Sequence, residues 1–396
     1  MQGNDVKLGL VGPVQLEPLR PWLDLDEAQS AALPPGHGGT PVTQLAVGML
    51  SRGQSLTIVS LEPSIERPRE LRGAQLRLML GPYRPAHRSR DAFRAERHYI
   101  RDALRKDSPD VVHAHWTYEY ALGALASARP TLVTVRDWAP TILRLQPDPY
   151  RLARLAMSAV TLTRGRWFTV TSPYMRERLE RWGRRPMRLI PNAVGDGAFA
   201  VDAPIARPSE PTILAINNGF SRRKNVTVLL DAFQRVRTAW PSSTLSLVGI
   251  DYEPGGRAHS WAASRDLLTN VRFLGPVRHA RIAELLRRAT IFVHPALEES
   301  FGLVLVEAMA QRTPVIGGRS SGAVPWVLGD GSAGLLVDVT DPHQLAEAMR
   351  SLLADSDLRD LYSEAGFRRA WDNFRVATVL DQYEDCYRSV LAEAGT

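Results

Sequence analysis

The sequence is poor in cysteine and contains no long apolar run. Its single cysteine, Cys386, excludes an internal disulfide framework and a metal cage built from cysteines. No apolar stretch approaches the roughly 18–20 residues of a membrane-spanning helix, and the first residues lack the layout of a signal peptide. We therefore expect a soluble, cytoplasmic protein, and at most a peripheral contact with the inner face of a membrane.

Lysine is also scarce. Only Lys7, Lys106 and Lys224 are lysines among 49 basic residues, and the formal net charge is +7. This balance suits acidic partners such as phosphates or anionic lipid headgroups. No nucleic-acid-binding module is present, so we do not expect a nucleic acid partner. The arginine-rich stretch 84–106 predicts a solvated helix with one apolar face; the alternative is a basic amphipathic helix that contacts an anionic membrane.

Strands and helices alternate along the whole chain. At 396 residues the chain is too long for one ordinary domain. The alternation predicts an α/β fold of two doubly wound, Rossmann-like domains with parallel sheets. We place the first domain at residues 1–205, a linker at 206–211 and the second domain at 212–370.

The first domain opens with a strand, a glycine-rich loop and a helix. The strand is expected at Lys7–Gly12, and the loop ends in Gly38 and Gly39. The sequence Gly-x-Gly-x-x-Gly is missing, so a dinucleotide site is not supported. The second domain restarts with a strand at Thr212–Ile216.

Charged residues follow predicted strands at two places. Arg222, Arg223 and Lys224 crowd a loop between a strand and a helix. A lysine there suggests a point-charge contact to phosphate, and the alternative is a solvated basic turn. Arg136 and Asp137 follow the predicted strand Thr131–Val135, where they either display functional groups or form a surface turn.

Two histidines lie in the predicted strand Asp110–His115. From the alternation of side chains along a strand, we expect His113 and His115 to face opposite sides. That arrangement argues against a shared metal site, and no acidic cluster such as Asp-x-Asp is suitably placed. No metal is expected.

The stretch from His294 to Gln311 contains the strongest candidate site. We expect Ser300 to cap a helix and Gly302 to let a ligand approach the backbone. Free amides at such a helix start suit phosphate. Glu299 and Glu307 flank this start, and ribose hydroxyls would satisfy Glu307. The alternative is a buried helix whose Glu307 meets an arginine.

With these elements in place, the sequence resembles the retaining glycosyltransferases of family 4, which have the GT-B fold. Its most specific part is the run from Glu299 to Glu307, ESFGLVLVE, which matches the Glu-x7-Glu motif of that family. Weaker matches cover residues 36–61, 110–116, 189–194, 270–277 and 341–349. The resemblance extends over nearly the whole chain.

The resemblance implies a nucleotide-diphosphate sugar bound by the second domain. Glu307 would bond the ribose, and Glu299 and Lys224 would act at the donor hexose and its phosphate. Further donor contacts would come from the basic loop, the helix start and the first domain: Arg222, Arg223, Ser300, Phe301, Gly302, Leu303, Gly38 and Gly39. Residues 371–396 would form a helix that crosses back to the first domain.

The implied reaction is metal-independent transfer of a hexosyl group, with retention, to a hydroxyl of a glycan, glycolipid or small molecule. No cofactor is implied beyond the nucleotide sugar. An epimerase or sugar phosphorylase of the same fold, and a non-catalytic nucleotide-sugar-binding subunit, are the alternatives. Three positions depart from the family pattern: Gly219 replaces an arginine that Arg222 or Arg223 could supply, Arg136 replaces a sugar-contacting histidine, and Trp326 replaces a glutamate.

Overall fold

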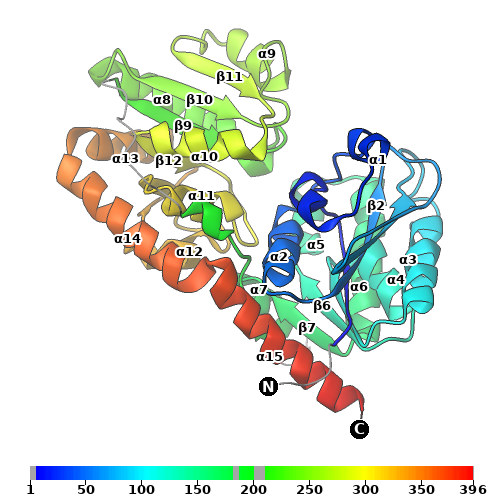
Figure 1. The fold of residues 1–396 in the computed structure, drawn as a ribbon. Helices are drawn as coiled ribbons and strands as arrows, with labels where there is room; N and C mark the ends of the chain where they lie inside the picture. The colour runs from blue at the N-terminus through cyan, green and yellow to red at the C-terminus, as the bar shows by residue number, and fades with distance from the viewer. Residues whose placement is uncertain (1–5, 182–186, 200–209, 396) are drawn as a thin grey trace. The chain divides into compact units, whose positions relative to one another are not determined.

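The computed structural model describes residues 6–181, 187–199 and 210–395. These residues form two compact units (Figure 1). Unit 1 contains the chain up to Ala193 together with Val376 onward, and unit 2 is Val194–Arg375. No helix of the described ranges is long and apolar enough to cross a lipid bilayer.

Unit 1 is built on an eight-stranded sheet in the order β3-β4-β2-β1-β5-β6-β7-β8. Its strands are β1 (Leu8–Val11), β2 (Leu56–Glu62), β3 (Arg69–Arg72), β4 (Leu76–Pro82), β5 (Val111–His115), β6 (Thr131–Val135), β7 (Trp167–Val170) and β8 (Arg188–Leu189). Its helices are η1 (Glu17–Trp22), α1 (Glu27–Ala31), α2 (Thr40–Ser51), α3 (Arg94–Asp107), α4 (Glu119–Leu125), α5 (Ala139–Leu145), α6 (Pro149–Arg164), α7 (Pro173–Glu180) and α15 (Val376–Ala394).

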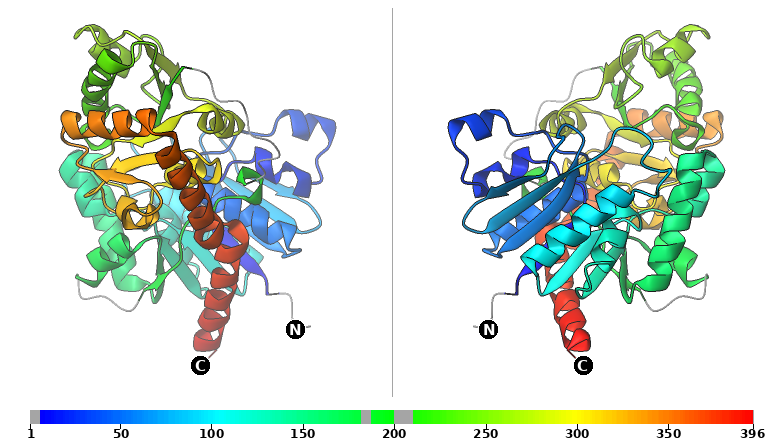
Figure 2. Two further views of the ribbon diagram at one scale, coloured as in Figure 1. Left: turned by 90° about the vertical axis from the view of Figure 1, so that its left-hand side faces the viewer. Right: turned by 90° about the vertical axis from the view of Figure 1, so that its right-hand side faces the viewer.

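Helices cover both faces of this sheet (Figure 2). The central strands are buried at every position, as strands of a parallel sheet between two helical layers are expected to be. On one face α2 and α15 contribute side chains such as Leu45 and Leu380 to the core. On the other face α3, α4 and α6 contribute side chains such as Ile100 and Met157. The predicted doubly wound fold is confirmed.

Two local predictions for unit 1 need correction. The helix expected over 84–106 begins only at Arg94, because Phe93 before it adopts a left-handed conformation. The strand β3 was not predicted, since its sequence RELR is charged and lacks an apolar alternation. It pairs antiparallel with β4 at the sheet edge, where charged side chains reach water.

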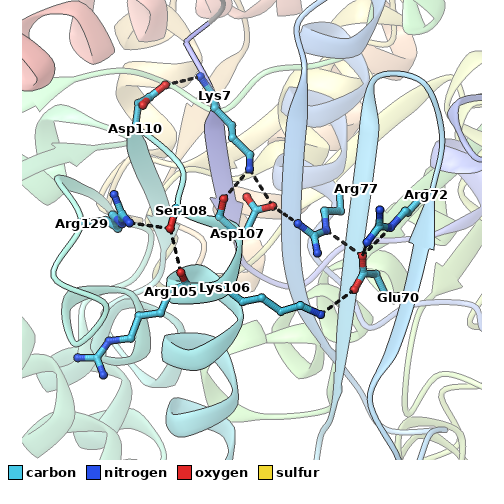
Figure 3. Close-up of polar contacts among 10 residues, drawn as sticks. All are labelled: Lys7, Glu70, Arg72, Arg77, Arg105, Lys106, Asp107, Ser108, Asp110 and Arg129. Atoms are coloured by element: carbon cyan, nitrogen blue, oxygen red, sulfur yellow. Dashed lines mark hydrogen bonds and ion pairs between the residues drawn. The ribbon is translucent and has the colours of Figure 1, made fainter.

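A polar network joins the amino-terminal ends of several strands (Figure 3). The buried carboxylate of Asp107 lies 3.0 Å from Lys7 Nζ and 2.6 Å from Arg77 Nη1. Arg77 also donates to Glu70, whose pKa this hydrogen bond, with help from Arg72 and Lys106, lowers to about 2. Lys7 and Lys106, two of the three lysines, therefore form ion pairs at the amino-terminal ends of the strands, away from the carboxyl ends where ligands bind.

Unit 2 contains a six-stranded parallel sheet in the order β11-β10-β9-β12-β13-β14. Its strands are β9 (Thr212–Ile216), β10 (Thr244–Val248), β11 (Val271–Gly275), β12 (Ile291–His294), β13 (Val315–Gly318) and β14 (Leu335–Val337). Its helices are η2 (Asp196–Ala198), η3 (Arg222–Lys224), α8 (Val226–Ala239), α9 (Arg257–Ala263), α10 (His279–Arg288), α11 (Leu303–Ala310), α12 (Val324–Val327), η4 (Gly329–Gly331), α13 (Pro342–Ala354) and α14 (Ser356–Phe374).

The division between the units differs from the boundaries expected at 205 and 371. Val194 N donates to Phe374 O over 2.8 Å, and the Phe199 ring packs edge-on against Trp371 at 5.4 Å. These contacts place 194–199 and 371–375 in unit 2. Most of the expected linker 206–211 lies outside the described residues. The last helix, α15, packs in unit 1, where Arg52 Nη1 contacts Glu384 at 2.8 Å.

Candidate functional site

The strand order of unit 2 reverses between β9 and β12. Strands β10 and β11 follow on one side of this pair, and β13 and β14 on the other. In such sheets, ligands bind at the carboxyl ends of the two strands where the order reverses. The segments that follow β9 and β12 are tied together, since Leu297 N donates to Arg223 O over 2.8 Å. Asn225 Nδ2 adds a bond to Pro295 O at 3.1 Å.

Lys224 and Glu299 meet at this point. Lys224 Nζ forms an ion pair with Glu299 Oε1, and the two side chains are only 11% and 13% exposed. His294, the last residue of β12, places its Nε2 atom 3.3 Å from the same oxygen. The structure thus brings together the two residues that the sequence analysis named as catalytic.

The charges of this cluster are fixed by its surroundings. Burial raises the pKa of Glu299, but Lys224, His294 and Arg223 lower it more, so the net pKa lies below the ordinary glutamate range. Burial lowers the pKa of His294, and Glu299 opposes only part of that shift. At neutral pH the cluster therefore holds an ionised carboxylate, an ammonium group and a neutral imidazole.

Two buried polar groups at this sheet edge lack a directed hydrogen bond within the described ranges. They are the Nδ1 atom of His294 and the Oδ1 atom of Asn217, which follows β9. Buried polar groups are nearly always satisfied in native proteins. Their concentration at the strand-order reversal is what a polar ligand site requires.

The two arginines beside Lys224 differ. Arg223 Nη1 lies 3.5 Å from Glu298 Oε2, and Glu298 is buried. Arg222 is exposed and forms no ion pair with any described residue. Both belong to the short helix η3, directly before α8.

The helix start differs from the prediction. Ser300 does not cap it; α11 begins at Leu303, and Gly302 occupies the cap position with a left-handed φ of 86°. A side chain is disfavoured at such a φ, so the chain turns there on glycine rather than on a serine cap. The Phe301 ring is buried and packs edge-on against Phe374 at 5.5 Å. The Phe301 side chain therefore belongs to the core and does not contribute a ligand contact.

Glu307 pairs with a histidine and not with an arginine. His279 Nε2 lies 2.8 Å from Glu307 Oε1, and the Glu307 side chain is 13% exposed. The hydrogen bond that His279 donates to Glu307 raises the pKa of His279, although burial opposes it. Among the described residues no hydrogen bond or ion pair joins this pair to Lys224 or Glu299, so Glu307 forms a second polar centre on α11.

In unit 1 the predicted glycines lie before α2. Gly39 is its cap residue, with φ of 72°, and a Cβ there would lie 1.8 Å from Pro13 O. Gly38 has φ of 65°, but a Cβ there would meet nothing within 4 Å. Gly39 is thus required by its own backbone packing, whereas the space beside Gly38 is open. The role of both glycines toward diphosphate stays a prediction.

Arg136 and Asp137 lie at the carboxyl end of β6. Arg136 is buried against His115, and Asp137 accepts a hydrogen bond from Tyr118 Oη at 2.8 Å. The prediction that His113 and His115 face opposite sides is wrong, because residues two apart on a strand share a face. Their ring centroids are 4.0 Å apart. Within the described ranges no group of His, Cys, Asp or Glu could hold a metal ion.

Two departures from the family pattern have a local structural basis. Gly219 has φ of 86°, and a Cβ there would reach Asp251 Oδ2 only at 4.0 Å. Backbone conformation, rather than space, therefore disfavours an arginine at Gly219. The Trp326 ring packs edge-on against Phe301 at 6.2 Å and Phe374 at 5.5 Å, so this residue joins the core.

The sequence analysis gave no role to His294, His279 or Asn217. Each lies at the carboxyl end of a strand or at the start of a helix in unit 2. A polar residue that ends a buried apolar strand was the available indication for His294 and Asn217. His279 had none, because its contact with Glu307 joins residues 28 positions apart.

Two family models match the chain and together cover most of it. The model described as Glycosyltransferase Family 4 matches residues 38–196. The model described as Glycosyl transferases group 1 matches residues 200–369.

Curated relatives match over much of their length. A phosphatidyl-myo-inositol mannosyltransferase of Mycolicibacterium smegmatis is 30% identical over 365 residues, covering 85% of this chain and 87% of the relative. The lipopolysaccharide core biosynthesis glycosyltransferase LpsE of Rhizobium meliloti is 30% identical over 255 residues, covering 62% of this chain and 73% of the relative.

Solved structures match the fold. Sucrose-phosphate synthase from Thermosynechococcus elongatus superposes with a TM-score of 0.79 at 23% identity, covering 98% of this chain and 99% of that one. HepE of Anabaena, in complex with UDP and glucose, has a TM-score of 0.68 at 16% identity, covering 97% of this chain and 100% of that one.

Proposed function

The chain belongs to glycosyltransferase family 4, and from this premise we propose that it transfers a hexosyl group from a nucleotide-diphosphate sugar to a hydroxyl acceptor with retention of anomeric configuration. The observation that carries the proposal is the largely buried Lys224–Glu299 pair at the strand-order reversal of unit 2. It sets a fixed cation and an ionised carboxylate where a doubly wound domain binds its ligand. A diphosphate and a sugar need those two kinds of group.

The proposed chemistry exchanges one bond to the anomeric carbon for another. The bond from this carbon to the β-phosphate oxygen breaks, and a bond to the acceptor oxygen forms on the same face of the sugar. The acceptor proton passes to the departing phosphate. Negative charge develops on that phosphate, and Lys224 would stabilise it together with the amides at Gly302 and Leu303.

The two glutamates would have different roles. Glu299 is ionised because nearby positive charge lowers its pKa, so it can accept hydrogen bonds from hydroxyls of the donor hexose. Glu307 lies further along α11 and bonds His279, and we assign it to the ribose hydroxyls. Diols are good donors to a carboxylate with two free lone-pair directions.

We propose that no metal takes part, because Lys224 and the helix amides already oppose the charge of the leaving phosphate. Activity that persists at full rate after chelation with EDTA supports this assignment. A loss of activity that Mg²⁺ or Mn²⁺ restores overturns it.

The names of the relatives suggest the acceptor class. The mycobacterial relative is named for mannosyl transfer to phosphatidyl-myo-inositol, and LpsE for the lipopolysaccharide core. We propose a glycan, a lipid-linked glycan or a small polyol as acceptor. For a lipid-linked acceptor, the exposed Arg94, Arg105 and Lys106 of α3 would contact an anionic membrane. Salt-sensitive co-sedimentation with phosphatidylglycerol vesicles tests that contact.

A thermal-shift screen with UDP-, GDP- and ADP-sugars identifies the donor, since a ligand of the folded state raises the melting temperature. Calorimetry with the selected nucleoside diphosphate then tests the site. We expect Lys224→Ala to weaken diphosphate binding by about tenfold, as the loss of one charge-assisted contact predicts. Lys106→Ala is the matched control because this lysine is 65% exposed and lies in unit 1, in the network at the amino-terminal ends of the strands.

The glutamates separate binding from turnover. We expect Glu307→Ala to weaken nucleotide binding and Glu299→Ala mainly to lower kcat. Unchanged kinetics in both variants would contradict the assignment of Glu299 and Glu307 to the donor site.

The same assays distinguish the rival activities. An epimerase converts the nucleotide sugar without an acceptor, and a phosphorylase requires inorganic phosphate. A non-catalytic binding subunit, which the departures at Gly219 and Arg136 favour, binds the donor but transfers nothing to any acceptor.

A further inference from the structure

Arg136 is the only arginine among the described residues that is buried, with 7% of its surface exposed. It follows β6 directly, at the carboxyl end of that strand. Burying a guanidinium group is costly unless an opposite charge accompanies it. The groups around the guanidinium therefore decide whether its charge is compensated.

Every side chain that contacts the Arg136 guanidinium is neutral. Its Nε and Nη2 atoms lie 3.1 and 2.9 Å from His115 Nδ1. Its Nη1 atom donates to the amide oxygen of Asn192, and the Trp116 ring centroid lies 5.6 Å from the guanidinium carbon. Tyr383 and Tyr387 are also near, and burial raises the pKa of both phenols, so they remain uncharged.

No carboxylate of the described chain forms an ion pair with Arg136, including the adjacent Asp137. Three other buried sites do pair the two charges: Glu96 lies 2.7 Å from Arg84, Asp107 lies 2.6 Å from Arg77, and Glu298 lies 3.5 Å from Arg223. Arg136 thus combines burial with the lack of a carboxylate partner among the described residues.

His115 supplies a second, independent observation. Arginine only donates hydrogen bonds, so His115 Nδ1 accepts and its proton lies on Nε2. Burial, with His113 and Arg136, lowers the pKa of His115 well below its ordinary value, so the ring stays neutral. The Nε2 atom is buried and has no hydrogen-bond partner in the described ranges. A donor is therefore left unsatisfied beside the unmatched cation.

This cluster lies where unit 1 is expected to bind a ligand. The strand order of its sheet reverses between β1 and β5, and His115 ends β5. The Cδ2 atom of His115, which is bonded to Nε2, is 3.4 Å from where a Cβ on Gly12 would lie, just after β1. Trp116 and Asn192 are partly exposed, so the cluster reaches the surface.

We propose that Arg136 and His115 bind an oxyanion, a carboxylate or phosphate group carried by one of the two substrates. That the anion belongs to a donor sugar or an acceptor rests on the proposed function. That the bound group is negatively charged rests on Arg136 and His115 alone. The transferred sugar would then be a uronic acid, or the acceptor would carry a phosphate or carboxylate. The anion would supply the charge that the guanidinium lacks and accept a hydrogen bond from the Nε2–H group of His115.

Binding of free anionic sugars tests the site without any nucleotide. We would titrate glucose 6-phosphate, glucuronate and glucose into the wild type, Arg136→Gln and Arg136→Lys by calorimetry. The wild type should bind one of the two charged sugars at least about tenfold more tightly than glucose, as one charge-assisted contact predicts. Arg136→Gln should lose this preference, and Arg136→Lys should keep part of it.

The matched control is Arg176→Gln, which makes the same chemical change at an arginine of α7 that is 46% exposed. It should keep the full preference. Thermal unfolding in buffer without multivalent anions guards against misfolding. Arg136→Gln should melt no lower than the wild type, since it removes an unmatched buried charge, whereas a purely structural arginine would leave a less stable protein.

Nucleotide sugars identify the source of the anion. If the transferred sugar carries it, UDP-glucuronate should bind the wild type at least about tenfold more tightly than UDP-glucose, and Arg136→Gln should bind both alike. If the acceptor carries it, both nucleotide sugars bind equally, and glucose 6-phosphate binds in the presence of UDP.

A wild type that treats charged and neutral sugars alike in all these titrations overturns the inference. Nucleotide binding in that case leaves the proposed function intact. If charged sugars bind through Arg136 but no nucleotide binds, the proposed nucleotide-sugar donor is wrong and the anion site stands.

Discussion

The Lys224–Glu299 pair gives the sharpest test of the site, because it is held almost entirely out of water. Replacing Lys224 by methionine keeps most of the side-chain volume and removes the charge. Glu299 would then remain buried with His294 and Arg223 as its nearest positive or polar groups. Glu299→Gln makes the converse change and leaves the ammonium group unpaired.

The magnitude follows from burial and separation. With side chains 11% and 13% exposed, an effective dielectric of about 20 applies, and two unit charges about 3 Å apart attract by roughly 5 kcal/mol before desolvation is counted. Removing one partner of such a pair typically costs about 3–5 kcal/mol. We expect about 3 kcal/mol for each single variant, since Arg223 and His294 compensate in part, and about 1 kcal/mol for the double variant.

Urea unfolding of the four proteins at pH 7 gives this double-mutant cycle. With these values the coupling free energy should be about 5 kcal/mol in magnitude. Because the folded pKa of Glu299 is depressed, its stabilisation is present above the unfolded value near 4.3 and is lost as the pH falls through the folded pKa. The coupling should therefore weaken below about pH 4. Single variants as stable as the wild type at pH 7 would refute the reasoning.

Three further predictions concern local chemistry and backbone. Glu307→Gln should lower the pKa of His279, which an NMR titration measures; an unmoved midpoint would contradict the contact. Because the folded pKa of His279 is raised, the pair stabilises the protein below about pH 6.5 and loses this effect as the pH rises through the folded pKa. Gly39→Ala should cost about 2 kcal/mol more than Gly38→Ala in thermal unfolding, because only its Cβ meets a backbone oxygen at 1.8 Å; equal losses would count against this account. Gly219→Arg should destabilise by about 1 kcal/mol through left-handed strain, so a stabilised variant would show that the glycine is not conformationally required.

The sequence allowed the architecture to be predicted because the central strands of both sheets are parallel and buried. Runs such as Thr131–Val135 and Thr212–Ile216 are apolar, short and separated by amphipathic helices, and the strands have those bounds. The edge strand Arg69–Arg72 was not predicted, because it forms by pairing with β4 and its own composition is not that of a strand. Local pattern therefore sufficed in the sheet centres and failed at an edge.

The site was predictable in its members but not in its contacts. Lys224 and Glu299 stand 75 positions apart, and only the strand order brings them together. Ser300 has the composition of a helix cap, but the left-handed turn at Gly302 starts the helix two residues later than a serine cap would. The contact between His279 and Glu307 could not be predicted, because neither local sequence indicates that the two side chains meet.

The basic loop allows a choice between Arg222 and Arg223 as the substitute for the family arginine at Gly219. Arg223 is engaged with the buried Glu298, so Arg223→Gln should chiefly destabilise the fold by removing this ion pair. Arg222 is exposed and has no such partner in the described ranges, which leaves its charge for the diphosphate. We expect Arg222→Gln to weaken binding of the selected nucleoside diphosphate by about threefold to tenfold at low salt, and by less at about 0.5 M salt, where exposed charges are screened. Calorimetry at both salt concentrations, with unfolding curves for both variants, separates the roles. Weakened binding in Arg223→Gln alone, at unchanged stability, would reverse the assignment.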